Sequence, residues 1–290
     1  MPEKDTVVIT GATSGLGRLV ALELAKRGFH LVLTARSKER AQATRSEIEA
    51  IAPSANVEFF YGNLAELKNV SRLGSEIAAA YPAIDVLVNN AGIHAFESRI
   101  TSEGLPEMMT VNYLAPWLLT HILRPSLQKA KQAGVINVAS EASRRHGGLK
   151  LPDDLTETSP FTARGSSLVY GKTKLLNIMF TAEFSRRWSQ AGIRANALNP
   201  GFNVTGLGRE LGFASVLERL LTAFRIGDPR RGAEIITRLI VDPVYQRQTG
   251  GYFNVGTGKS IVPAAPGGDP LVQKQLWEAT EDLLARRGFL

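Results

Sequence analysis

Short apolar segments alternate with longer helical patterns along almost the whole chain, and this alternation limits the fold more than any other feature. Seven runs are typical of strands, at residues 7–9, 31–33, 57–61, 86–88, 135–138, 195–198 and 252–255. Helices are expected between them, at 15–27, 37–51, 66–80, 105–131 and 168–190. Strands that are apolar on both faces belong in parallel sheets covered by helices. We therefore expect an α/β fold, a doubly wound parallel sheet of about seven strands with helices on both faces.

Composition narrows the possible functions. The chain has no cysteine, which removes disulfides, thiol nucleophiles and cysteine-ligated metals. No apolar run approaches the roughly 18–20 residues that span a bilayer, and the first residues lack the pattern of a signal peptide. No His, Asp or Glu cluster has the spacing of metal ligands. We expect a cytoplasmic protein without a membrane anchor or a metal site.

The formal net charge is +7. Its basic residues are scattered, so a solvated surface is the preferred interpretation and a nucleic-acid partner is not expected. Such a surface would also attract a polyanionic cofactor.

A glycine-rich turn follows the first strand, in the run Thr10-Gly11-Ala12-Thr13-Ser14-Gly15-Leu16-Gly17. Without side chains, a backbone can turn sharply and approach a pyrophosphate, and the following helix points its free N–H groups at the phosphates. A plain turn is the alternative. The place of the glycines after the first strand favours a dinucleotide.

The end of the second strand concerns the choice of cofactor. Sites for NAD usually carry an acid there, which accepts from the ribose 2′-hydroxyl. This chain has Arg36 and no acid nearby in the run 34–38. An arginine can pair with a 2′-phosphate and stack on adenine, so we expect NADPH/NADP+, with Arg40 as a further candidate. The alternative is a surface arginine without a ligand.

Tyr170 and Lys174 lie four residues apart in a helical pattern and share one face. A free tyrosine has a pKa near 10, and a nearby ammonium lowers it towards the working range. Ser140 ends the fifth strand, at the edge where parallel sheets bind ligands. Its hydroxyl would hold a substrate oxygen beside the phenol. Asn112, inside a helical pattern, is expected to have a specific hydrogen-bonding role.

Together these residues resemble the short-chain dehydrogenase/reductase family. The resemblance rests on the order and spacing of Thr10 to Gly17, Asn-Asn-Ala-Gly at 89–92, Asn112, Ser140, Tyr170 to Lys174, and Asn-Pro-Gly at 199–201. It implies a single-domain Rossmann fold over 1–290. A long insertion at 141–168, with Asp153-Asp154-Leu155 inside it, resembles the retinol dehydrogenase and protochlorophyllide reductase branch.

The resemblance also implies roles. Tyr170 would be the general acid or base, Ser140 would orient the substrate and Lys174 would bind the nicotinamide ribose. Asn112 would hold a water in the proton relay. The implied cofactor-binding residues are Gly11, Thr13, Ser14, Gly15, Leu16, Gly17, Arg36, Arg40, Asn63, Leu64, Asn90, Ala91, Gly92, Tyr170, Lys174, Pro200, Gly201, Asn203 and Thr205.

Some features depart from the family or leave choices open. Asn63 stands where the family often has Asp, and Asn203 where it often has an aliphatic residue. We expect a substrate lid at 202–227, a tail helix within 264–290, and reduction of a hydrophobic aldehyde or ketone, or the reverse reaction. A non-catalytic NADPH-binding regulator is the alternative, and both a monomer and a homodimer remain open.

Overall fold

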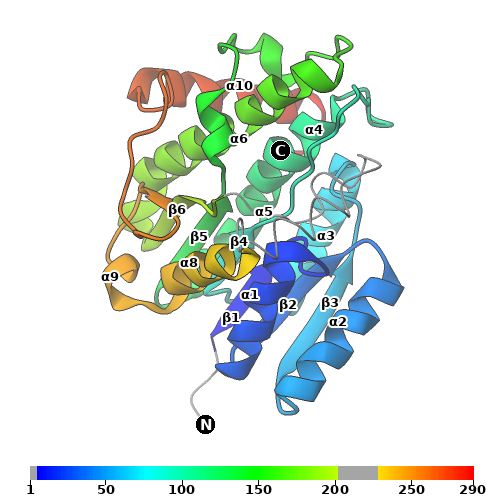
Figure 1. The fold of residues 1–290 in the computed structure, drawn as a ribbon, viewed down its shortest axis with the longest axis vertical. Helices are drawn as coiled ribbons and strands as arrows, with labels where there is room; N and C mark the ends of the chain where they lie inside the picture. The colour runs from blue at the N-terminus through cyan, green and yellow to red at the C-terminus, as the bar shows by residue number, and fades with distance from the viewer. Residues whose placement is uncertain (1–4, 202–227) are drawn as a thin grey trace.

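A single parallel sheet forms the centre of the molecule (Figure 1). The computed structural model describes residues 5–201 and 228–290. Its strands are β1 (Thr6–Ile9), β2 (His30–Ala35), β3 (Asn56–Tyr61), β4 (Val86–Asn89), β5 (Ala133–Val138), β6 (Ile193–Asn199) and β7 (Tyr252–Asn254). The strand order is β3-β2-β1-β4-β5-β6-β7, with every pair parallel. All seven strands and their parallel arrangement are confirmed.

Helices cover both faces of this sheet. They are α1 (Gly15–Lys26), α2 (Lys38–Ile51), α3 (Leu67–Ala80), α4 (Glu107–Met109), α5 (Ala115–Lys129), α6 (Ala163–Trp188), α8 (Pro229–Val241), α9 (Pro243–Gln246) and α10 (Pro270–Arg286). Short helical turns are η1 (Thr110–Leu114), η2 (Glu141–Arg144), η3 (Asp153–Leu155) and η4 (Ser189–Ala191). Where one helix was expected at 105–131, the structure has α4, η1 and α5 in succession. The helix α6 begins at Ala163 rather than near Leu168.

Successive residues of each strand enter different cores, as strand geometry requires. Val7 and Ile9 of β1 pack with α1, α2 and α8, whereas Val8 between them packs with α3, α5 and α6. Both faces of the sheet are therefore buried, which explains why its strands are apolar throughout.

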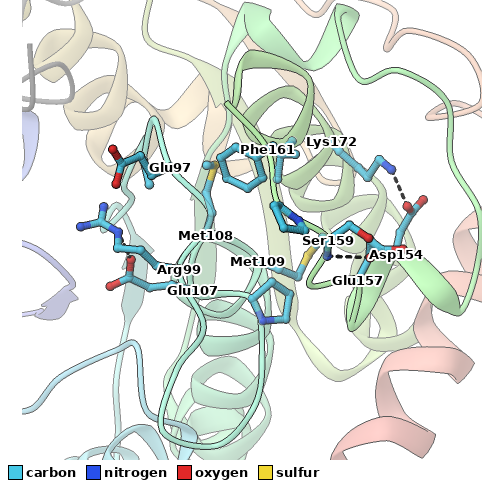
Figure 2. A pocket seen from close by; sticks show the side chains of 14 residues that line it. Glu97, Arg99, Glu107, Met108, Met109, Asp154, Glu157, Ser159, Phe161 and Lys172 are labelled. Carbon is cyan, nitrogen blue, oxygen red and sulfur yellow. Dashed lines mark hydrogen bonds and ion pairs between the residues drawn. The ribbon is translucent and has the colours of Figure 1, made fainter. Parts of the chain in front are cut away.

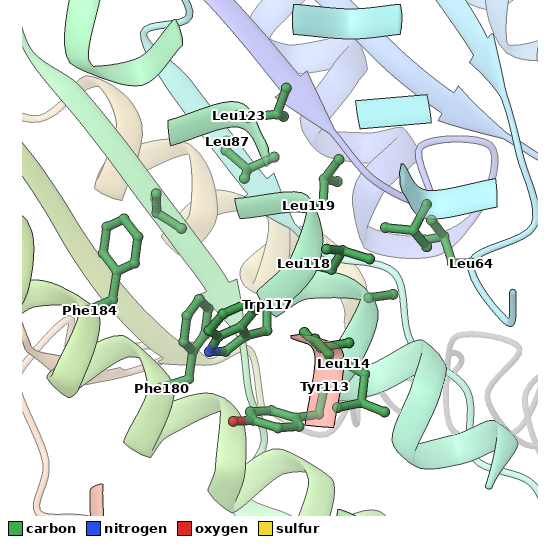
Figure 3. Close-up of a cluster of buried hydrophobic side chains, with 14 of the residues drawn as sticks. Leu64, Leu87, Tyr113, Leu114, Trp117, Leu118, Leu119, Leu123, Phe180 and Phe184 are labelled. Atoms are coloured by element: carbon green, nitrogen blue, oxygen red, sulfur yellow. The ribbon is translucent and has the colours of Figure 1, made fainter. Parts of the chain in front are cut away.

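The C-terminal helix α10 completes the core on the α5–α6 side. Trp277 of α10 is buried, and its ring centroid lies 4.8 Å from that of Trp117 on α5 and 5.9 Å from that of Phe180 on α6. Figure 3 shows Trp117 and Phe180 within this cluster. The tail helix expected within 264–290 is therefore present and packs on the core.

The helices α8 and α10 each begin with an acidic cap. Asp228 and Asp269 accept from the backbone N–H groups of Arg230 and Leu271 at 2.9 and 2.8 Å, and a proline follows each cap. Such caps typically contribute about 1 kcal/mol each.

Candidate active site

The tyrosine, the serine and the lysine singled out from the sequence meet beyond the carboxyl end of β5. The Tyr170 hydroxyl lies near the side chain of Ser140, which acts to lower the pKa of the phenol. One turn along α6, Lys174 Nζ donates to the carbonyl oxygen of Val138 at 2.8 Å and lies 5.6 Å from the centre of the Tyr170 ring. The fold therefore places a phenol, a hydroxyl and an ammonium at one edge of the sheet.

The electrostatics differ from the expectation that Lys174 lowers the pKa of Tyr170. Burial raises the pKa of Tyr170 to about 12, and the nearby Ser140 side chain acts in the opposite direction without reversing the shift. Burial also lowers the pKa of Lys174 to about 8. Desolvation dominates both groups, because a low-dielectric environment disfavours either charge. Near neutral pH the phenol thus keeps its proton, and most of the lysine remains an ammonium.

Asn112 connects the loop after β4 to α6. Its side-chain amide exchanges two hydrogen bonds with the backbone of Ile93, at 2.8 and 2.9 Å, and donates to Thr173 Oγ1 at 3.1 Å. Its main-chain oxygen accepts from Asn177 Nδ2 at 2.8 Å. It lies in η1, a π-helical turn, a feature frequently found at functional sites. The expected specific hydrogen bonding of Asn112 is present.

The glycine after the tyrosine allows α6 to approach the serine loop. A Cβ atom on Gly171 would collide with the main-chain oxygens of Ala142 and Arg145, on and next to η2. Any side chain here would push α6 away from η2, whose N-cap residue is Ser140. Gly171 thus keeps α6, and Tyr170 with it, close to the loop that carries Ser140.

A histidine that sequence reasoning missed completes the surroundings of the phenol. The rings of His94 and Tyr170 are stacked, with centroids 4.6 Å apart and planes 17° apart. His94 Nε2 lies 3.2 Å from Ser166 Oγ, and that hydroxyl donates its proton to the Ala163 carbonyl oxygen at 2.8 Å. Nε2 must therefore be the donor towards Ser166. The only signal in the sequence was its place just after Asn-Asn-Ala-Gly.

The glycine-rich turn has the geometry of a phosphate cradle. A Cβ atom on Gly17 would press on Asn90 Nδ2 and lie 2.6 Å from the carbonyl oxygen of Gly11. Asn90 Nδ2 donates to the oxygens of Thr10 and Gly11 at 2.8 and 3.3 Å, which ties the turn to β4. The helix α1 begins at Gly15, and Ser14 is its N-cap residue. The first N–H groups of α1 are thus available for an anion. The remaining predicted members of the turn are Thr13 and Leu16, both half-buried.

The predicted adenosine-side residues divide into two groups. Arg36 directly follows β2 and is exposed, and Arg40 is exposed on the first turn of α2. Asn63 Oδ1 accepts from the N–H of Ala65 at 3.2 Å, and Leu64 is buried in the core. The arginine side chains could reach a ligand, whereas Asn63 and Leu64 have structural contacts of their own.

The other predicted residues lie at the ends of β4 and β6. Ala91 donates its N–H to Thr10 Oγ1 at 3.0 Å, and a Cβ on Gly92 would lie 3.3 Å from Lys174 Nζ. Gly201, after Pro200, donates its N–H to Asn199 Oδ1 at 3.0 Å. Asn203, Thr205 and the expected lid at 202–227 lie outside the described residues.

The described residues contain neither a candidate metal site nor a candidate membrane-spanning helix. Within 5–201 and 228–290, no group of three His, Asp or Glu side chains could hold a metal ion. Among the helices of those same ranges, none has both the length and the apolarity needed to cross a membrane.

Comparison with known proteins places this arrangement in a family. The family model described as short chain dehydrogenase matches residues 5–150. The chain belongs to the short-chain dehydrogenase/reductase family. It is 30% identical to human retinol dehydrogenase 13, over 96% of this chain and 84% of that protein. It is 33% identical to a Streptomyces protein named as a daunorubicin C-13 ketoreductase, over 95% of this chain and 91% of that protein. These relatives confirm the retinol dehydrogenase-like branch.

Solved structures agree on the fold. A protein of Beutenbergia cavernae, named as an NAD(P)-dependent gluconate 5-dehydrogenase and holding NADP, has a TM-score of 0.66, with 25% identity over 86% of this chain and 94% of that one. The 3-ketoacyl-(acyl-carrier-protein) reductase of Brucella melitensis, complexed with NADH, has the same TM-score and identity over 89% and 99%. The family is one of nicotinamide-dependent oxidoreductases that act on carbonyl or alcohol groups.

Proposed function

We propose that this protein reduces a hydrophobic aldehyde or ketone to an alcohol with NADPH, with Tyr170 as the proton donor. The observation that carries the proposal is the Tyr170 hydroxyl beside the Ser140 side chain, one helical turn from the Lys174 ammonium. Relatives named as a ketoreductase and as retinol dehydrogenases support chemistry between carbonyl and alcohol.

The glycine-rich turn fits a dinucleotide, because Gly11 and Gly17 let its backbone pack closely against the end of β4 at the start of α1, where a Cβ atom would collide. Gly11 to Gly17 would hold the pyrophosphate, with Asn90 to Gly92 beside the adenosine ribose. Lys174 would bind the nicotinamide ribose, while Pro200 and Gly201 would contact the nicotinamide end, with Asn203 and Thr205 proposed beyond them. When bound, the cofactor supplies the hydride for the carbonyl carbon.

The chain's own residues would then handle the substrate oxygen and its proton. Ser140 would hold the carbonyl oxygen beside the Tyr170 hydroxyl. Because burial raises the pKa of Tyr170 to about 12, the phenol carries its proton at neutral pH and can donate it as the alcohol forms. Asn112 keeps the loop after β4 against α6 through its bonds to Ile93 and Thr173.

The preference for NADPH rests on Arg36. It is exposed directly beyond β2, where an NAD site usually has an acid for the ribose 2′-hydroxyl. A guanidinium there would pair with a 2′-phosphate, and Arg40 on the next turn would add to the positive charge. Asn63 and Leu64 would contact the adenine through the turn that they occupy.

The proposal is tested by following NADPH oxidation with a panel of hydrophobic aldehydes and ketones. Tyr170→Phe removes the proton donor but keeps the ring stacked on His94, so turnover should fall about 1,000-fold, within the range for general acid catalysis. NADPH binding, measured by fluorescence, should change little. If Tyr170→Phe and the unaltered protein show the same rate, the catalytic role of the tyrosine is wrong. A protein that binds NADPH without turnover would instead be a non-catalytic regulator.

A further inference from the structure

A cavity of about 220 Å³ lies between the inserted segment 141–168, the start of α4 and the start of α6. Its apolar lining includes Met108, Met109, Phe161 and Val169. Figure 2 shows Phe161 and Met108 towards its centre and charged side chains around its margin. Among the described residues that line it, none belongs to the group of Ser140, Tyr170 and Lys174.

The wall supplied by the insertion is fixed in place. Asp154, which is only 9% exposed, accepts from the N–H of Lys150 at 2.5 Å and forms an ion pair with Lys172 of α6. Leu155, next to it, is buried in the core cluster. The insertion is therefore attached to the helix that carries Tyr170.

Two residues of the lining are sequence neighbours of the groups at the phenol. Val169 immediately precedes Tyr170 on α6, and Ala95 immediately follows His94, whose ring is stacked on Tyr170. The wall of the cavity and the reactive phenol thus share α6 and the loop after β4.

The charges at the margin of the cavity exclude anionic ligands. Four carboxylates and two cations belong to the lining: Glu97, Glu107, Asp154, Glu157, Arg99 and Lys172. Both cations already form ion pairs. Arg99 Nε lies 2.8 Å from Glu107 Oε2, and Lys172 pairs with Asp154. The hydrogen bonds from Ser159 lower the pKa of Glu157, which keeps that carboxyl ionised. An anionic group would meet a surplus of negative charge here.

We infer that this cavity binds an uncharged apolar group of the substrate, distinct from the carbonyl that reacts at Tyr170. An apolar cavity of about 150 Å³ holds a benzene molecule, so this one has room for about eight or nine carbon atoms. The inference rests on the proposed function for the reactive end of the molecule. It names the substrate class as a carbonyl compound with a neutral hydrocarbon or aromatic arm.

The experiment uses 2-alkanones from butanone to tetradecanone with NADPH. For the unaltered chain, kcat/KM should rise about three- to fourfold for each added methylene, and then level off once the arm fills the cavity. Val169→Phe places a ring in the cavity, and should reduce the ratio of kcat/KM for long over short ketones at least tenfold. Leu168→Phe, at the exposed neighbouring residue outside the lining, is the matched control and should keep the original length dependence.

Phe161→Ala enlarges the cavity instead and should move the levelling point to longer ketones. This variant decides the question if Val169→Phe does not fold in a thermal unfolding check. A length dependence that is absent, or that Val169→Phe and Phe161→Ala both leave unaltered, would overturn the inference.

Calorimetry with Tyr170→Phe and NADPH separates this inference from the proposed function, because it needs no turnover. A long 2-alkanone should bind at least tenfold more tightly than an analogue ending in a carboxylate, and Val169→Phe in the same background should remove that advantage. Binding of this kind without turnover by the unaltered chain would reject the reductase function alone. Turnover without length dependence would reject the cavity's role alone.

Discussion

At the glycine-rich turn the fixing contacts end on main-chain oxygens of the turn, whereas the inserted segment is fixed to α6 by an ion pair between two side chains. Asn90 Nδ2 holds the carbonyl oxygens of Thr10 and Gly11, and Gly17 leaves no space for a side chain. In the insertion, the buried carboxylate of Asp154 pairs with Lys172 of α6.

Because their contacts differ, the two regions respond differently to substitution. Main-chain contacts depend on backbone shape, so the turn can be shared by proteins that bind the same dinucleotide. Side-chain contacts change with every substitution, so the insertion can adapt the space beside Tyr170 to one substrate. The helix α6 contacts the insertion through Lys172 and the end of β5 through Lys174.

The largest effect is expected at the turn. Gly17→Ala brings a methyl group against Asn90 and the Gly11 carbonyl, so the backbone must shift and NADPH binding should weaken about 100-fold. Gly268→Ala is the control, because a Cβ there meets nothing within 4 Å and should leave binding unchanged. Fluorescence titration with NADPH measures both variants. Equal affinity of Gly17→Ala and the unaltered chain would show that the turn does not hold the cofactor.

A side chain beyond the turn is expected to choose between the two cofactors. Arg36→Asp replaces a partner of the 2′-phosphate with a repelling charge, so the ratio of kcat/KM for NADPH over NADH should fall about 30-fold or more. Lys26→Asp makes the same change of charge at the far end of α1 and should leave that ratio within about twofold. A ratio near one in the unaltered chain would contradict the assigned preference.

A smaller effect is expected where the insertion meets α6. Asp154→Asn removes the charge that pairs with Lys172, and should lower the free energy of unfolding by about 2 kcal/mol. Asp153→Asn, at the exposed neighbouring position, should change it by less than about 0.5 kcal/mol. Urea unfolding at pH 7 measures both values. If the two variants are equally stable, the insertion is not held by this ion pair.

The smallest effect is a pH dependence of stability from Lys174. Its pKa is about 8 in the folded chain and near 10.5 when exposed, so the unfolded chain binds more protons between these values. The free energy of unfolding should therefore rise by about 1 kcal/mol between pH 7 and 9, relative to Lys174→Met. Parallel curves for the two proteins would mean that the lysine is not desolvated.

The sequence predicted the sheet and the group around Tyr170 because both leave local signals. β-branched apolar runs identify buried strands, and the spacing from Tyr170 to Lys174 is that of one helical turn. It did not show where α6 begins, since the Gly165-Ser166-Ser167 run has weak helix propensity and Ser166 is instead held by its bond to Ala163. His94 was missed because its partner Tyr170 is distant in the chain.

The sequence by itself determined which functional groups follow which elements. A glycine turn follows β1, Arg36 follows β2, and a tyrosine and a lysine lie on one helix. Only the tertiary structure decided how Tyr170 is charged, because desolvation depends on what surrounds a group and not on its neighbours in sequence. The same holds for the cavity beside Val169. Its volume is the space left between three segments that meet only after folding.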